Sequence, residues 1–342
     1  MRLLIYELLS TGKIAGDRDL AAQGFAMLDA VLEDFAAVPG LDLATVLDGS
    51  LRCRAAASGY AGRVAITWSG GEDRWAEDFA TALRQCDGAL VIAPETDGLL
   101  TKLTSQIENR GKFVLGSTAA ATALAGNKAC SLMRLRQAGL PVPQSAAFSH
   151  TTPPDWHCLT AAGFTPPVVV KPVDGTSCLG LTLAADEVSL KNACHKVAEA
   201  SRQPIFLVQE YISGEPASVS CLVAAGRALP VSVNRQLVDS GASFCFKGIT
   251  VPYSHPQAAA AKSVAKRACE AITGLSGFVG VDVVFGPSGP VIMEINPRIT
   301  VAYIALRRVV GANLAAELCR LPVRGLPPLG PQITGSYTYL VD

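Results

Sequence analysis

The sequence contains few charged residues, and the two signs balance. Charged side chains make up 17% of the 342 residues and hydrophobic ones 49%, with 29 basic and 29 acidic residues. A zero formal net charge gives no support to a nucleic-acid partner or a polybasic membrane anchor. The composition is that of a folded globular protein, and the length allows two or three lobes with cores of their own.

Long apolar runs and paired cysteines are missing as well. No run approaches the roughly 20 residues that a membrane span needs. The first residues, MRLLIYELL, lack the cleavage site of a signal peptide, so we expect a buried strand there. The ten cysteines form no C-x-x-C pair, which argues against zinc sites and thioredoxin-like sites. We expect reduced thiols without a catalytic role, in a cytoplasmic protein.

Two common nucleotide motifs are absent from the N-terminal third. Strand-like segments alternate there with helical patterns such as 21–37, which predicts a parallel sheet in an α/β lobe. No G-x-G-x-x-G follows the first strand, and STGK at 10–13 lacks the first glycine of a Walker A loop. The rest of the chain mixes strands with helical patterns at 117–140, 186–201, 256–273 and 301–320.

Near the C-terminus, two runs rich in β-branched residues flank the turn GPSGP, which predicts a hairpin over 278–295 with a five-residue turn. Pairing of Phe285 with Val291 would set Asp282 directly opposite Glu294. Side chains directly opposed across two strands lie close together, and like charges there repel each other. The hairpin therefore predicts a positive group between the two carboxylates.

The donor atoms on this hairpin suggest what that positive group is. Because side chains alternate along a strand, Ile292, Glu294 and Asn296 should share a face with Asp282. Asp282, Glu294 and Asn296 offer only oxygen ligands, which suit Mg²⁺ or Mn²⁺ held together with substrate phosphates. The alternative is a structural ion pair with Arg298 that closes one end of the sheet.

Two further segments carry groups suited to a nucleotide. Lys171 ends an apolar strand and precedes a turn with Gly175, Thr176, Ser177 and Gly180, whose backbone N–H groups and hydroxyls could hold phosphate; many such turns bind nothing. In VQEYISGE at 208–215, the two glutamates could bind ribose hydroxyls and the adenine amine, or they could lie on a solvated bend.

Taken together and in this order, four segments resemble the ATP-grasp superfamily of carboxylate–amine ligases. They are 116–145, 168–180, 208–220 and 280–298. The resemblance implies an ATP-grasp fold of class α/β, with α+β character in the C-terminal half. It implies an N-terminal pre-ATP-grasp lobe with a parallel sheet at 1–116 and two ATP-binding lobes. These are a central lobe with a phosphate flap at 117–204 and a C-terminal lobe with the metal site at 205–342.

The resemblance also implies a role for each matching residue. ATP and Mg²⁺ or Mn²⁺ would be bound, the metal by Asp282, Glu294 and Asn296. Arg235 and Arg298 would hold the γ-phosphoryl group and the acceptor carboxylate, with Lys171 assisting. The remaining nucleotide contacts would be Lys128, Lys171, Asp174, Gly175, Thr176, Ser177, Gln209, Glu210, Tyr211, Ile212 and Glu215.

The implied reaction is amide-bond formation through an acyl phosphate, with release of ADP and phosphate. The N-terminal stretch RLLIYELLSTG is most similar to the enzymes of methanofuran biosynthesis that join the γ-carboxylate of L-glutamate to tyramine. Tyr6 and Glu7 would contact the amine or only pack at the strand end. The alternatives are a D-alanine–D-alanine-like or pyrrolysine-pathway-like ligase, or an ATP sensor without ligase activity. The partners would be small molecules, not nucleic acid or membrane. A homodimer is left open.

Overall fold

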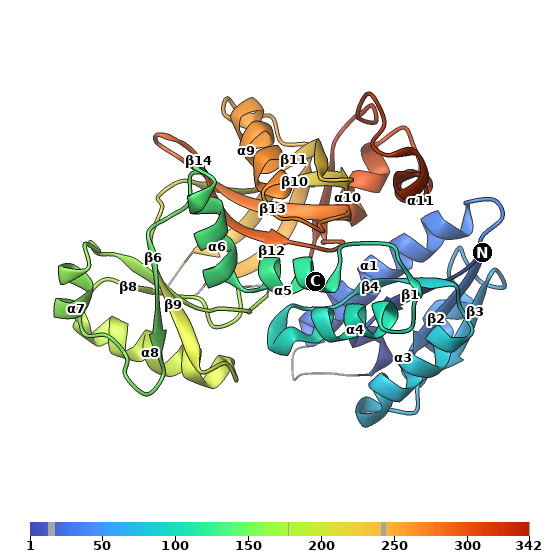
Figure 1. The fold of residues 1–342 in the computed structure, drawn as a ribbon, viewed down its shortest axis with the longest axis horizontal. Coiled ribbons are helices and arrows are strands. Elements are labelled where there is room, and N and C mark those ends of the chain that lie inside the picture. Colours follow the sequence, from blue (N-terminus) through green and yellow to red (C-terminus); the bar gives the residue numbers. More distant parts are fainter. Residues whose placement is uncertain (13–17, 177, 241–243, 342) are drawn as a thin grey trace.

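The computed structural model describes residues 1–12, 18–176, 178–240 and 244–341, and the strands in these residues form three sheets (Figure 1). The blue N-terminal lobe and the green and yellow central lobe lie at opposite ends of the view, with the orange C-terminal sheet above them. No helix in this part of the chain is long and apolar enough to cross a membrane.

The N-terminal lobe is a five-stranded parallel sheet with helices on both faces. Its elements are β1 (Arg2–Glu7), η1 (Leu9–Thr11), α1 (Arg18–Ala36), β2 (Asp42–Leu47), η2 (Gly49–Leu51), α2 (Arg52–Ala56), β3 (Val64–Trp68), η3 (Glu72–Arg74), α3 (Trp75–Arg84), β4 (Gly88–Ile92), η4 (Thr96–Gly98), α4 (Leu99–Glu108) and β5 (Phe113–Val114). The strand order is β3-β2-β1-β4-β5. Because side chains alternate along β1, Leu3 and Ile5 pack on α1, whereas Leu4 and Tyr6 pack on α3 and α4. The predicted parallel sheet is confirmed.

The central part of the chain forms a four-stranded antiparallel sheet in the order β6-β9-β7-β8. Its elements are α5 (Ala119–Gly126), α6 (Lys128–Gln137), β6 (Ser145–Ser149), α7 (Trp156–Ala161), β7 (Val168–Pro172), β8 (Thr182–Ala184), α8 (Glu187–Ala200) and β9 (Ile205–Glu210). Helices α7 and α8 share a core with this sheet. Since β9 pairs with β6 and β7, we propose that the lobe boundary lies after Glu210 and not after residue 204.

The predicted helix over 117–140 is in fact two helices. Asn127 leaves the helical conformation (φ −94°, ψ 105°), and its side chain accepts a hydrogen bond from the Cys130 backbone N–H at 3.1 Å. This N-cap starts α6 at Lys128. The break therefore fixes the lysine at the first position of a helix.

The C-terminal lobe is a six-stranded antiparallel sheet in the order β14-β13-β10-β11-β12-β15. Its elements are β10 (Glu215–Ala224), β11 (Arg227–Ser240), β12 (Phe244–Val251), α9 (Ala258–Glu270), β13 (Gly277–Gly286), β14 (Gly289–Asn296), α10 (Ala302–Val309), α11 (Leu314–Arg324) and β15 (Tyr337–Leu340). Helices α5, α6 and α9 share a core with one face of the sheet. Side chains of the other face share a core with α1, α10 and α11, where Arg307 donates hydrogen bonds to Asp34 at 2.6 and 3.0 Å.

The hairpin of β13 and β14 is tighter than the sequence predicts. Phe285 pairs with Pro290 and not with Val291, because the turn holds only two residues between Gly286 and Gly289. A bulge then shifts the register by one residue, so that Asp282 still pairs with Glu294. The predicted opposition of the two carboxylates is confirmed, although the predicted register near the turn is wrong.

The bulge also decides which side chains face the ligand cavity. Ile292 was expected beside Glu294, but it lies fully buried in the core on the face that packs against α5, α6 and α9. The additional residue is Met293, which lines the cavity together with Glu294 and Asn296. The strand therefore presents two consecutive side chains to the cavity.

Candidate active site

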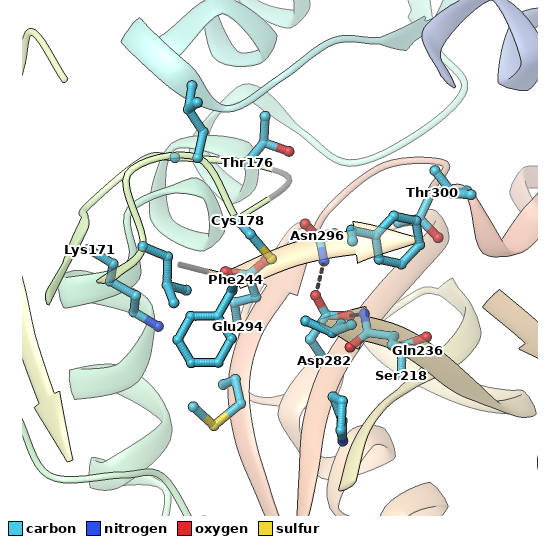
Figure 2. Close-up of a pocket in the computed structure, with 18 of the residues that line it drawn as sticks. Lys171, Thr176, Cys178, Ser218, Gln236, Phe244, Asp282, Glu294, Asn296 and Thr300 are labelled. Atoms are coloured by element: carbon cyan, nitrogen blue, oxygen red, sulfur yellow. Dashed lines mark hydrogen bonds between the residues drawn. The ribbon is translucent and has the colours of Figure 1, made fainter. Parts of the chain in front are cut away.

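Residues from all three sheets line one cavity of about 310 Å³, which is within the size range of small-molecule sites. Asp282, Glu294 and Asn296 line one part of it, and Lys171 projects from the central sheet (Figure 2). The structure therefore brings the predicted metal ligands and a predicted phosphate ligand to the same cavity.

Asp282 is held by two amide side chains. Asn296 Nδ2 donates to Asp282 Oδ2 at 3.2 Å, and Gln236 Nε2 donates to Asp282 Oδ1 at 3.1 Å (Figure 2). Burial and the neighbouring Glu294 raise the pKa of Asp282 well above its usual value. Burial alone would also raise the pKa of Glu294, but Lys128 and Lys171 lower it below its usual value. The pair thus favours one negative charge over two when no cation is added.

This donor set fits a hard divalent cation. Two carboxylates and an amide oxygen are ligands that Mg²⁺ and Mn²⁺ accept, and Mg²⁺ needs only one or two protein carboxylates when substrate phosphates complete its shell. Across the described ranges, no group of three or more His, Cys, Asp and Glu side chains is placed to hold a metal ion. A cation at Asp282 and Glu294 would therefore depend on a ligand for the rest of its coordination.

The two predicted lysines are both buried beside these carboxylates. Lys128 Nζ lies 3.1 Å from Glu294 Oε2 and donates to the carbonyl of Gly175. Lys171 Nζ donates to Gln209 Oε1 at 2.8 Å, and burial lowers its pKa to about 8. Both ammonium groups are placed to neutralise phosphate at this end of the cavity.

The predicted phosphate flap contributes unequally to the cavity. Gly175, Thr176 and Cys178 line it, and burial raises the pKa of the Cys178 thiol to about 12, which disfavours the nucleophilic thiolate. Asp174 does not line the cavity; it accepts a hydrogen bond from the Asp97 backbone N–H at 2.8 Å. Ser177 lies outside the described residues.

Four of the predicted nucleotide contacts lie at the end of β9. Gln209, Glu210, Tyr211 and Ile212 all line the cavity. Gln209 is fully buried, and its Nε2 donates to Ser145 Oγ at 3.0 Å while its Oε1 accepts from Lys171. The side chain therefore holds Lys171 in place as well as lining the pocket.

Arg235 and Glu215 do not line the cavity, and the roles expected for them stay predictions. Their side chains lie 3.8 Å apart and are about half exposed, and Glu215 also accepts from the Tyr253 hydroxyl at 2.6 Å. Alternation along β11 explains the difference, because Gln236 next to Arg235 points to Asp282. Gln236 is a site residue that the sequence reasoning missed, although strand alternation could have identified it.

Arg298 does line the cavity, with an unexpected partner. Its guanidinium donates two hydrogen bonds to the carboxylate of Glu95, at 2.8 and 2.9 Å. Both side chains are at least nine-tenths buried. Glu95 follows β4, 203 residues away in the sequence. No local pattern predicted this pair.

The N-terminal lobe adds a buried carboxylate to the cavity wall. Glu7 lines the cavity and accepts hydrogen bonds from the backbone N–H groups of Leu9 at 3.1 Å and Ser10 at 2.7 Å. A Cβ atom at Gly24 would lie 2.8 Å from this carboxylate, so the glycine lets α1 approach it. Tyr6 is instead fully buried and packs edge-on against Phe79.

Comparison with known structures identifies the same fold elsewhere. A putative ATP-grasp superfamily protein from Archaeoglobus fulgidus has a TM-score of 0.68 at 22% identity, covering 100% of this chain and 99% of that chain. An L-amino acid ligase from Bacillus licheniformis has a TM-score of 0.68 at 16% identity, covering 97% and 75% respectively. At these identities the likeness concerns the fold.

Sequence comparison identifies the family. A tyramine–L-glutamate ligase from Methanocaldococcus jannaschii is 34% identical over 221 residues, which are 65% of this chain but only 58% of that enzyme. A D-alanine–D-alanine ligase from Gloeobacter violaceus is 30% identical over 230 residues, 63% of this chain and 74% of that enzyme. The pre ATP-grasp 3 domain family matches residues 41–122, and the ATP-grasp domain family matches residues 125–302. Since the second match spans over half of the sequence, the chain belongs to the ATP-grasp family.

Proposed function

We propose that the protein is an ATP-dependent ligase that joins the γ-carboxylate of L-glutamate to the amine of tyramine, releasing ADP and phosphate. The observation that carries the proposal is the pairing of Asp282 with Glu294 inside a cavity that also holds Lys128 and Lys171. Two partly buried carboxylates and two buried ammonium groups are the charges needed to hold a metal–triphosphate complex. An ATP sensor would not need Arg298 and Glu7 to line the same cavity.

In this mechanism the protein positions the reactants and stabilises charge. Lys128 and Lys171 bind phosphate oxygens, and Arg298 orients the carboxylate that attacks the γ-phosphoryl group. A divalent ion held by Asp282, Glu294 and Asn296 would neutralise charge on the phosphates when bound. Transfer converts the carboxylate into an acyl phosphate, whose phosphate then leaves as the amine attacks the acyl carbon and loses a proton.

The wall next to the N-terminal lobe supports a simple amine as the acceptor. Its side chains are largely apolar, and burial raises the pKa of the Glu7 carboxyl group, which is placed to accept a hydrogen bond or a proton from an amine. The apolar residues of this wall include Leu9, Met27, Ile92, Ala93, Pro94 and Val301. Within the described residues, the cations that line the cavity are Lys128, Lys171 and Arg298, and each has a protein partner.

An amino-acid acceptor is the second candidate, favoured by the similarity to D-alanine–D-alanine ligase. Such an acceptor carries its own carboxylate, which would face Glu7 and the apolar wall. Burying an unpaired carboxylate there would be costly. This contrast favours tyramine over alanine or another amino acid.

The test is ADP release by the full chain with ATP, Mg²⁺, L-glutamate and tyramine, leaving out one component at a time. We expect release to require all four. Alanine and tyrosine replace tyramine as controls, because tyrosine differs from it by one carboxylate. ADP release that needs neither glutamate nor tyramine would contradict the ligase, and equal rates with tyrosine would contradict the choice of acceptor.

A further inference from the structure

The donors of Arg298 are almost fully used by protein groups. Its Nε and Nη2 contact the two oxygens of Glu95 at 2.8 and 2.9 Å. Nη2 also donates to Thr176 Oγ1 at 3.2 Å, and Nη1 donates to the Ile299 carbonyl at 3.2 Å. A guanidinium has five N–H groups. Four are therefore engaged, and one on Nη1 remains.

Glu95 and Thr176 contact different edges of the planar guanidinium. Glu95 occupies the edge formed by Nε and Nη2, as a bidentate carboxylate does. The second N–H of Nη2 then belongs to the outer edge, which it shares with Nη1, and that N–H is the one given to Thr176. A carboxylate or phosphoryl group that binds the outer edge with two hydrogen bonds must displace the Thr176 hydroxyl.

We propose that Glu95 is a positioning residue that turns the outer edge of Arg298 toward the substrate. Thr176 occupies this edge until the carboxylate substrate, or the phosphoryl group transferred to it, replaces the hydroxyl. The proposal rests on the proposed function for the identity of the carboxylate substrate, L-glutamate. It assigns Glu95 a part in substrate binding that differs from a purely structural ion pair.

A second set of contacts joins the same two segments. Asp174, two residues before Thr176, accepts from the Asp97 backbone N–H at 2.8 Å, and the Thr96 hydroxyl donates to the Asp174 carbonyl at 3.2 Å. Asp97 has a left-handed backbone (φ 56°), which is uncommon for a residue other than glycine. The segment with Glu95 therefore anchors both Arg298 and the turn that contains Thr176.

The first test compares two buried arginine–carboxylate pairs. E95Q removes the charge that orients Arg298, whereas D34N makes the same kind of change at Arg307, outside the cavity. We expect E95Q to raise the KM for L-glutamate by at least about tenfold, the effect of one lost charge-assisted contact. The KM for ATP should stay within about twofold, and D34N should lower thermal stability without changing either KM selectively. Equal losses for both substrates in E95Q, or no change in either, would overturn the proposal.

The second test uses Thr176. T176V frees the outer edge of Arg298, so the KM for L-glutamate should fall by about threefold, as expected for removing one competing hydrogen bond. Its kcat should fall at the same time, because the displaced hydroxyl is no longer available to the phosphate. T176S keeps the hydroxyl and should show the smaller change of the two. A raised KM for L-glutamate in T176V would contradict the proposed exchange.

A third measurement needs no substrate and separates this proposal from the proposed function. Thermolysin cleaves before large apolar residues, and Leu179, three residues after Thr176, is 51% exposed. Cleavage at Leu179, followed by mass spectrometry, should be faster in T176V and E95Q than in the wild type and D34N. Equal cleavage rates would overturn the proposal even if the ligase assay succeeds. Faster cleavage would support it even if the wild type is inactive with glutamate.

Discussion

Asp282 and Glu294 occupy directly paired positions on β13 and β14, yet their two carboxyl groups have opposite pKa shifts. The difference comes from the lysines, because Lys128 contacts Glu294 and not Asp282. Without an added cation, burial and Glu294 raise the pKa of Asp282 and so favour its neutral form, whereas Lys128 and Lys171 lower the pKa of Glu294 and favour its charged form. A site arranged in this way is suited to exchange a proton for a divalent cation.

Replacing Asp282 with Asn should separate stability from activity. The raised pKa of Asp282 means that the folded wild type binds more protons than the unfolded chain above the usual Asp range, so its stability falls as pH rises through that interval. D282N should lose this dependence and be more stable at pH 7 without metal, by roughly 1 kcal/mol. Denaturant unfolding checks the stability change.

In the same variant, turnover with Mg²⁺ should fall by at least about a hundredfold, because one of the proposed metal ligands is gone. Stabilisation of the fold by Mg²⁺ with ADP should fall as well. Wild-type activity in D282N would show that the carboxylate pair is structural. The matched control is D34N, which removes a buried carboxylate outside the cavity.

Lys171 should make ATP use sensitive to alkaline pH. Burial lowers its pKa to about 8, so the free enzyme loses this cation as pH rises past that value, and kcat/KM for ATP should fall above it. The K171R variant keeps its charge and should show no such fall, whatever its absolute rate. The lowered pKa of Lys171 also affects folding stability. Between about pH 8 and the pKa of an unfolded lysine, the unfolded chain binds the proton more strongly than the folded protein does, so the contribution of Lys171 to the free energy of unfolding rises with pH. A pH profile of K171R parallel to that of the wild type would assign the fall to another group.

Adjacent residues on β11 should differ sharply in their effect on activity. Arg235 lies outside the cavity and contacts Glu215, whereas Gln236 donates to Asp282. We expect R235Q to change kcat by less than about threefold and Q236L to lower it by at least about tenfold, since the latter leaves a buried acceptor unpaired. Steady-state kinetics of the two variants give the comparison. The reverse order would restore the assignment of Arg235 made from the sequence.

Local sequence patterns predicted much of the site because they act over short distances. Strand alternation placed the carboxylates on one face, but Asp282 lies opposite Glu294 because two deviations cancel: the turn is tighter than expected, and the bulge restores the expected register. The bulge at Met293 was not predicted, since a one-residue shift changes the register without changing the apolar pattern of the flanking strands. Strands β12 and β15 were not expected either. They pair across 88 residues in the sequence, and no short-range pattern records such a pairing.

A substitution at Gly24 tests the cavity wall next to the N-terminal lobe. Alanine is normally preferred to glycine inside a helix by about 1 kcal/mol, but a Cβ atom at residue 24 would lie 2.8 Å from the Glu7 carboxylate. We therefore expect G24A to lower the melting temperature and to raise the KM for the amine more than the KM for ATP. An increase in melting temperature with unchanged kinetics would show that α1 and Glu7 can move apart at no cost.

The proposed function depends most on the activation of a carboxylate by phosphoryl transfer. The direct measurement is turnover with L-glutamate labelled with ¹⁸O in its γ-carboxylate, in the presence of ATP, Mg²⁺ and tyramine, followed by mass analysis of the released phosphate. An acyl phosphate passes one carboxylate oxygen to phosphate, so the released phosphate should carry a single ¹⁸O atom. Phosphate without ¹⁸O, released together with the amide product, would contradict it.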